Sequence, residues 1–213
     1  MGRLLLVRHG QASWGSDDYD VLSPLGHRQG KALGEIWRLR GVVPDRVIIG
    51  GMRRHRETAE AAGLSELVVD EEWNEFDHDG VLAKLPVPDE AGTDRAVFQR
   101  WFEASTDRWT SGAHDDYDES FSDFAARIER ALVRASSYDG LTAVFTSGGP
   151  IAWTAATLLA DDPGLRNQLW SRLNPVCVNT GVTHVVSGRR GRTLVSFNEH
   201  THLEGRPDLL SYR

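Results

Sequence analysis

An arginine and a histidine follow directly after the first apolar run of the chain. The run Leu4–Val7 is typical of a short buried strand, and Arg8, His9 and Gly10 come next. Catalytic groups of α/β proteins gather where such strands end. An imidazole can attack phosphorus while a neighbouring guanidinium binds the phosphoryl oxygens through its planar fork. The tripeptide therefore indicates phosphoryl chemistry, although a histidine at a strand end is more often a structural hydrogen-bonding group.

Further motifs follow this tripeptide in the order Leu22–Gln29, Met52–Ala59, Glu75 and Thr146–Gly149. With Arg8–Gln11 they resemble the histidine phosphatase superfamily, the phosphoglycerate-mutase-like proteins, and the resemblance extends from Arg3 to about Leu203. Several separated motifs in the right order are far more specific than any one of them. The chain departs from the family pattern at Ser147, where the family has a second histidine before the paired glycines.

The resemblance implies catalytic roles for individual residues. His9 is the expected nucleophile, which forms a phosphohistidine that water later opens. Arg8 and Arg54 are expected to bind the oxygens of the transferring phosphoryl group, and the spacing of residues 54–59 favours Arg54 over Arg53. Glu75 matches the family's general acid. The acidic run around it leaves four alternatives open: Glu71, Glu72, Asp77 and Asp79.

Substrate binding is assigned by the same motifs to Gly10, Gln11, Ser147, Gly148 and Gly149. A serine offers one neutral hydroxyl on a shorter arm than a histidine. The loss of one well-aimed donor costs about 2.7 to 4 kcal/mol at a transition state, which predicts slow turnover. The backbone amides of the two glycines, at a helix N-terminus, are expected to compensate in part. An alternative role for Ser147 is to cap that helix.

Other histidines could occupy the space of the missing imidazole. His78 follows Glu75 closely, and His200 and His202 form a His-x-His pair. We expect the space to be empty, in which case Ser147→His should raise the phosphorylation rate by on the order of tenfold or more. If a histidine already fills it, the added imidazole should lower the rate. The remaining histidines have no chemical partner in the sequence and are interpreted as ordinary surface or core residues: His27, His55, His114 and His184.

Strand and helix patterns alternate along the chain. Strands are indicated at residues 4–8, 46–49, 67–69, 142–146, 182–186 and 193–197, and helices at 24–37, 54–62, 121–135, 151–159 and 164–173. Ser23 and Pro24 are typical of a helix start. The order predicts a single-domain three-layer α/β sandwich with a mostly parallel central sheet, helices on both faces and a terminal hairpin. The strand ends that carry His9, Gly50 and Ser147 are expected to meet at one edge.

Length and charge limit the organisation and the partners of the chain. Its 213 residues contain no linker rich in proline, glycine or serine, so one domain over residues 1–213 is predicted. The resemblance implies a variable substrate-covering insertion at about 77–119, whose acidic residues disfavour highly anionic substrates such as polyphosphorylated inositols. A formal net charge of -7 argues against nucleic acid or an anionic membrane surface as the main partner. The oligomeric state is not specified.

Cysteine content and apolar runs bear on cofactors and location. Cys177 is the only cysteine, which excludes an intramolecular disulfide and a cysteine metal cluster. The pair of His200 and His202 could bind a metal, but with only two glutamates beside it we expect no metal and no cofactor. No apolar stretch is long enough for a membrane span or a signal peptide, so a cytoplasmic location is expected.

Within the family, the sequence favours a phosphatase over a mutase. Gly15 stands where mutase-type sequences usually carry a phosphate-contacting asparagine, and Glu75 is followed by Phe-Asp-His rather than Tyr-Gly. The expected activity is metal-independent hydrolysis of a small phosphorylated metabolite. The first alternative, motivated by Ser147, is a pseudoenzyme that binds phosphate or a phosphorylated partner without turnover. The second is a phosphoglycerate-type mutase. A pure binder has no need of the acid Glu75, which argues against the pseudoenzyme.

Overall fold

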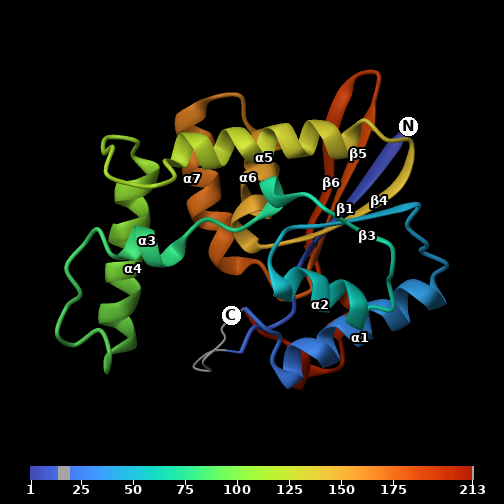
Figure 1. The fold of residues 1–213 in the computed structure, drawn as a ribbon, viewed down its shortest axis with the longest axis horizontal. Coiled ribbons are helices and arrows are strands. Elements are labelled where there is room, and N and C mark those ends of the chain that lie inside the picture. The colour runs from blue at the N-terminus through green and yellow to red at the C-terminus, as the bar shows by residue number, and fades with distance from the viewer. Residues whose placement is uncertain (14–19, 213) are drawn as a thin grey trace. The chain divides into compact units, whose positions relative to one another are not determined.

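The computed structural model describes residues 1–13 and 20–212, and this part of the chain contains one six-stranded sheet (Figure 1). The strand order is β3-β2-β4-β1-β5-β6. The first four strands of this order are parallel, whereas β5 is antiparallel to both β1 and β6. The bounds are β1 (Gly2–Arg8), β2 (Arg46–Ile49), β3 (Leu67–Val69), β4 (Gly140–Thr146), β5 (Val182–Gly188) and β6 (Gly191–Glu199). The predicted α/β fold with a terminal hairpin is confirmed.

Helices alternate with these strands. They are α1 (Pro24–Leu39), α2 (Arg53–Ala61), α3 (His78–Leu82), α4 (Arg95–Thr110), α5 (Phe121–Ser136), α6 (Gly148–Leu159) and α7 (Pro163–Leu173), with short 3-10 turns η1 (Glu71–Trp73), η2 (Asn174–Val176), η3 (Thr201–Leu203) and η4 (Pro207–Leu209). Ser23 caps α1 as expected, because its side chain accepts a hydrogen bond from the amide of Gly26 at 3.1 Å. No helix of the described residues is long and apolar enough to cross a membrane.

Helix α6 begins earlier than the sequence indicates. Its first residue is Gly148 rather than Ile151, and Pro150 is its third residue. The first amides of a helix have no partner inside the helix, so proline at this position removes no intrahelical hydrogen bond. The amides of Gly148 and Gly149 therefore belong to the first turn, where they are available to acceptors outside the helix.

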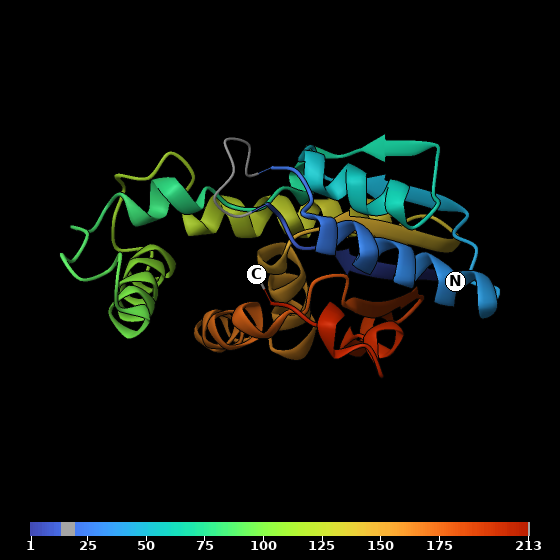
Figure 2. The ribbon, with the colours of Figure 1, turned by 90° about the horizontal axis from the view of Figure 1, so that it is seen from below.

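The two faces of the sheet are covered by different helices (Figure 2). Alternate residues of the strands, including Val7, Ile49 and Phe145, pack against Leu33 of α1 and Ala59 of α2 in one apolar cluster. Helix α6 contacts β1 and β6, and α7 packs on α6. Burial of an aliphatic or phenyl side chain contributes about 1.5 to 3 kcal/mol, so this packing fixes the positions of the strand ends.

The chain divides into two compact units. The sheet unit contains Met1–Glu75 and the chain from Ile128 onward, and the insert unit contains Phe76–Arg127. The sequence pattern predicts no elements within residues 77–119, where the structure has α3 and α4. The role of this segment as a substrate cover stays a prediction.

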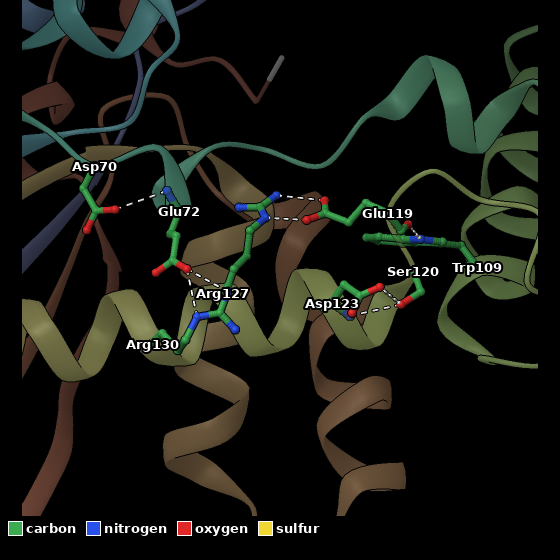
Figure 3. Close-up of polar contacts among 8 residues, drawn as sticks. All are labelled: Asp70, Glu72, Trp109, Glu119, Ser120, Asp123, Arg127 and Arg130. Carbon is green, nitrogen blue, oxygen red and sulfur yellow. Dashed lines mark hydrogen bonds and ion pairs between the residues drawn. The ribbon is translucent and has the colours of Figure 1, made fainter.

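The insert unit has its own small aromatic core. The ring of Trp109 stacks on Phe76, with the centroids 4.7 Å apart, and meets Phe121 edge-on at 5.0 Å. Glu119 accepts hydrogen bonds from Arg127 through its carboxylate and from the indole of Trp109 through its backbone carbonyl (Figure 3). The acids and aromatics of the insertion thus serve partly as its internal structure.

Candidate active site

Buried ionisable groups gather where three parallel strands end. The neighbouring strands β1, β4 and β2 run parallel and end at the same edge of the sheet. His9 follows β1, Ser147 follows β4 and Gly50 follows β2. Among the residues that the structure describes, Glu75 is the only buried carboxylate and Arg54 the only buried guanidinium. A buried charge is costly unless it is paired or put to use. Their concentration at this edge of the sheet marks it as the candidate active site.

His9 is held as a neutral imidazole with one defined tautomer. Its side chain is buried, and Nδ1 lies 2.7 Å from the carbonyl oxygen of Gly10. A carbonyl only accepts, so Nδ1 carries the hydrogen and Nε2 keeps its lone pair. Burial lowers the pKa of His9 well below its ordinary value, and the charges of Arg54 and Arg8 lower it further. The ring therefore presents an unprotonated Nε2, the form in which histidine is a nucleophile.

The turn that carries His9 is fastened from several sides. The His9 amide donates to the carbonyl of Thr146 at 2.9 Å, and the side chain of Asn179 donates to the carbonyl of His9 at 3.0 Å. The Gly10 amide donates to the hydroxyl of Thr58 at 2.9 Å. A Cβ at Gly10 would lie 2.6 Å from the carbonyl oxygen of Gly26 at the start of α1, so only glycine allows this approach. Nothing in the sequence singled out Asn179.

Arg54 pairs with an acid that the sequence analysis did not consider. Its Nη1 lies 2.7 Å from a carboxylate oxygen of Asp20, whose other oxygen accepts the Arg53 amide at 2.8 Å. Asp20 therefore orients the buried guanidinium and also caps the first turn of α2. By contrast, the neighbouring side chain of Arg53 is more than half exposed and pairs with Glu57. This difference agrees with the assignment of Arg54 to the site.

Arg8 and Gln11 are both engaged within the protein. Nη1 of Arg8 donates to the carbonyls of Cys177 and Tyr212. Its Nε lies 3.7 Å from the position of a Cβ on Gly148, so the guanidinium adjoins the start of α6. The side-chain oxygen of Gln11 accepts from the hydroxyl of Ser23 at 2.9 Å, which ties the loop to the cap of α1.

Glu75 lies against the first turn of α6. Its Oε2 accepts the amide of Gly149 at 3.1 Å, so this amide, one of those expected to bind phosphate, has a carboxylate partner. Three of the alternative acids, Glu71, Asp77 and Asp79, are exposed, and Asp77 caps α3. Burial therefore separates Glu75 from its neighbours in a way that the sequence could not.

Helix α5 holds the 3-10 turn that leads to Glu75. Arg130 donates to the carboxylate of Glu72 at 2.8 Å, and the carboxylate of Asp70 accepts the Glu72 amide at 3.2 Å (Figure 3). Arg134 adds an ion pair to Asp70 at 2.9 Å. Trp73, the last residue of η1, is fully buried, and its carbonyl accepts from Thr146 at 2.5 Å. The turn is thus anchored on both sides before the chain reaches Glu75.

Ser147 contacts a histidine that the sequence analysis interpreted as ordinary. Its Oγ lies 2.8 Å from Nε2 of His55, and both side chains are fully buried. The centroid of the His55 ring is 5.8 Å from that of His9. Ser147 stands at the N-cap position of α6, as the capping alternative expects, but its side chain makes no capping hydrogen bond.

The three histidines that could occupy the space of the missing imidazole have other contacts. His202 is hydrogen-bonded to the hydroxyl of Thr180 at 2.8 Å, and His200 to the carbonyl of Asn198 at 2.8 Å. In the insert unit, the ring of His78 lies 3.9 Å from that of Phe76. Among the described residues, no group of three or more histidines, cysteines or acids is placed to hold a metal ion. Gly15 lies outside the described residues.

Comparison with known proteins identifies the family. The model of the histidine phosphatase superfamily (branch 1) matches residues 4–200. The chain belongs to the histidine phosphatase superfamily. No curated protein matches it.

Solved structures of similar fold carry phosphatase names. A phosphoserine phosphatase mutant from Entamoeba histolytica, in complex with phosphoserine, has a TM-score of 0.69 at 18% identity and covers 95% of this chain and 100% of its own. A putative alpha-ribazole-5'-P phosphatase from Escherichia coli has a TM-score of 0.64 at 20% identity, covering 92% and 96%. Mycobacterial glucosyl-3-phosphoglycerate phosphatase has a TM-score of 0.59 at 23% identity, covering 93% and 99%. At these identities the similarity shows the shared fold of the superfamily.

Proposed function

We propose that this histidine phosphatase superfamily member hydrolyses a small phosphomonoester through a phosphohistidine on His9. The observation that carries the proposal is the neutral, buried imidazole of His9, whose Nδ1 is hydrogen-bonded to Gly10 and whose pKa is lowered by burial and by two arginines. An uncharged imidazole beside two guanidinium groups suits attack on a phosphoryl dianion, because the arginines neutralise the charge that the nucleophile does not.

The proposed reaction has two steps. In the first, Nε2 of His9 forms a bond to phosphorus while the phosphorus–oxygen bond to the alcohol breaks, and Glu75 gives its proton to the leaving oxygen. In the second, water attacks the phosphohistidine, Glu75 accepts a proton from that water, and the phosphorus–nitrogen bond breaks to release phosphate and His9. Arg8 and Arg54 stabilise the charge on the phosphoryl oxygens in both steps. No step uses a metal ion.

The phosphatases of similar fold support a proposed substrate class. The substrates in their names, including phosphoserine and glucosyl-3-phosphoglycerate, are small phosphomonoesters. A small phosphorylated metabolite is therefore our proposal for this chain, with hydrolysis favoured over a mutase reaction. The cytoplasmic location stays a prediction. The pseudoenzyme remains the second candidate, because Ser147 replaces a histidine of the family pattern.

Rapid-quench labelling tests the function directly. Wild-type protein, treated with a chelator and mixed with a phosphomonoester labelled in its phosphoryl group, should form a phosphoenzyme that is stable in base and labile in acid, and peptide mapping should place the label on His9. A requirement for a divalent ion, or a label on another residue, would overturn the mechanism. Tight binding of inorganic phosphate without any labelling would support the pseudoenzyme instead.

The adjacent arginines Arg53 and Arg54 provide a matched test of phosphate binding. Arg54→Ala should lower kcat/KM by on the order of 100- to 1,000-fold for every phosphomonoester, because the lost contact stabilises the phosphoryl group and not the leaving group. Arg53→Ala removes an equal charge from an exposed position and should change kcat/KM by less than about threefold. The measurement is steady-state kinetics on a series of esters. Comparable losses in the two variants would refute a specific role for Arg54.

A further inference from the structure

His55 and Ser147 form a buried pair beside the proposed nucleophile. Nε2 of His55 and Oγ of Ser147 are 2.8 Å apart, neither side chain is exposed, and the His55 ring neighbours that of His9. We propose that the two residues act as one hydrogen-bonding unit, in which His55 donates to Ser147 and Ser147 donates to a phosphoryl oxygen. The inference rests on the proposed function. The family's second histidine is expected to donate a hydrogen bond to the phosphoryl group. Here two side chains would share that role: the hydroxyl of Ser147 and the imidazole of His55 on α2.

The surrounding backbone is shaped around the His55 ring. A Cβ at Gly50 would lie 2.4 Å from Nδ1 and 2.8 Å from Cε1 of His55, closer than a real Cβ can approach. Glycine at this position therefore makes room for the imidazole. The side-chain oxygen of Asn74 accepts the Gly51 amide at 2.6 Å and so fixes the loop that borders the ring. Because Gly50 follows β2 and Ser147 follows β4, the ring is set between two strand ends.

The position of the hydrogen on His55 decides what Ser147 can do. Burial, followed by the charge of Arg54, lowers the pKa of His55 well below its ordinary value, while a hydrogen bond with the Gly50 backbone raises it, so the ring is neutral and carries one N–H. A hydrogen on Nδ1 faces Gly50 and leaves Nε2 as an acceptor, whereas a hydrogen on Nε2 faces Ser147. If Ser147 donates to Nε2, its only hydrogen is used. If Nε2–H donates to Ser147, the hydroxyl hydrogen is free to point at an acceptor. A phosphoryl oxygen is an acceptor, so its binding selects the second arrangement, and each hydrogen bond then strengthens the other.

The contacts at the first turn of α6 agree with this assignment. The Oγ of Ser147 lies against His55 and accepts no amide of the helix, and the Gly149 amide donates to Glu75. The groups that would touch the phosphoryl group and the leaving oxygen therefore meet at one helix terminus. A neutral imidazole and a hydroxyl also avoid placing a third cation beside Arg8 and Arg54, which like-charge repulsion would disfavour.

A double-mutant cycle tests the unit. His55→Phe keeps a planar ring and removes the N–H, and Ser147→Ala removes the hydroxyl. We expect each change to lower the single-turnover rate of His9 phosphorylation by on the order of 100-fold. The double variant should be no slower than the worse single variant, because either change breaks the same relay. His55→Gln, whose side-chain amide offers an N–H, should phosphorylate His9 at least tenfold faster than His55→Phe. Additive losses, or no recovery with glutamine, would overturn the proposal.

Binding of inorganic phosphate, measured by calorimetry, separates this proposal from the proposed function. Both single variants and the double variant should weaken phosphate binding by the same factor, whether or not the wild-type protein forms a phosphohistidine. If the wild-type protein binds phosphate but is not labelled, the proposed phosphatase function is refuted. The effects of the variants on phosphate affinity still test the His55–Ser147 hydrogen-bonding unit. His184→Phe, a ring-for-ring change in the middle of β5, controls for lost stability and should leave phosphate affinity unchanged. Unchanged affinity in His55→Phe as well would overturn the proposal.

Moving the histidine from position 55 to position 147 supplies a second test if His55→Phe fails to fold. Ser147→His alone should lower activity, since it adds an imidazole to space next to a fully buried ring. Ser147→His combined with His55→Ala puts the family's second histidine at its own position and clears the space beside it, so this double variant should be at least tenfold more active than Ser147→His. Higher activity in Ser147→His than in wild type would show that the donor is missing and would overturn the proposal.

Discussion

His9→Asn should abolish phosphoryl transfer without unfolding the protein. The asparagine amide can take the place of Nδ1 and donate to the carbonyl of Gly10, a bond that measures 2.7 Å from His9. It offers no counterpart to Nε2, so no phosphoenzyme can form. Removal of a covalent nucleophile lowers kcat by on the order of 10⁶-fold in a well-studied protease, and we expect a loss of at least roughly 10⁴-fold here. Steady-state hydrolysis and acid-quench labelling measure it.

The control for His9→Asn is the same substitution at an exposed histidine. His114 is exposed in the insert unit, and His114→Asn should leave kcat/KM within about twofold of wild type. A melting temperature of His9→Asn close to that of wild type excludes unfolding as the cause of lost activity. Residual turnover above one hundredth of wild type in folded His9→Asn protein would contradict covalent catalysis by His9.

The pH dependence of His9 gives an independent check. The pKa of His9 is lowered by burial, so the ring should stay neutral below the ordinary histidine pKa of about 6.5. Below that pH the unfolded chain binds a proton that the folded protein excludes, so the stability of the fold decreases by up to about 1.4 kcal/mol per pH unit for this group. His9→Asn should remove that contribution. An NMR titration that gives His9 a midpoint above 6.5 would contradict the neutral nucleophile.

Glu75→Gln should separate substrates by their leaving groups. Glutamine keeps an oxygen that can accept the Gly149 amide, now at 3.1 Å from Oε2, but it has no proton to transfer. Alkyl phosphates have basic leaving oxygens and should lose on the order of 10²- to 10⁴-fold in kcat/KM. A nitrophenyl phosphate, whose leaving group needs little protonation, should lose less than about tenfold. The ratio of the two losses is the measurement.

Glu72→Gln is the matched control for Glu75→Gln. Its carboxylate pairs with Arg130 and Arg134 outside the site, so the change should affect the melting temperature more than the leaving-group ratio. Equal losses of activity for alkyl and nitrophenyl esters in Glu75→Gln would show that Glu75 is not the acid. The next candidate would then be Asp77, which caps α3 in the insert unit.

Much of the fold could be predicted because local patterns specify it. The run Arg46–Ile49 and the run Leu67–Val69 form β2 and β3 with the expected bounds, since short apolar runs between turn residues have few alternatives to a buried strand. The predicted start of α6 at Ile151 was three residues late, because Pro150 was interpreted as the beginning of the helix. The first amides of a helix have no partner inside the helix, so proline is equally acceptable at the third helical position.

For the site, local patterns place particular residues at the ends of strands, and motif spacing identifies His9, Arg54 and Glu75. The partners of these residues depend on how the whole chain packs. Asp20 meets Arg54 across 34 positions, His55 meets Ser147 across 92, and Asn179 meets the His9 backbone across 170. Such contacts carry no local signal, because a hydrogen bond depends on distance and angle in space rather than on separation along the chain. Packing of the sheet and its helices brings these groups together, and it buries the imidazole of His55 against Ser147.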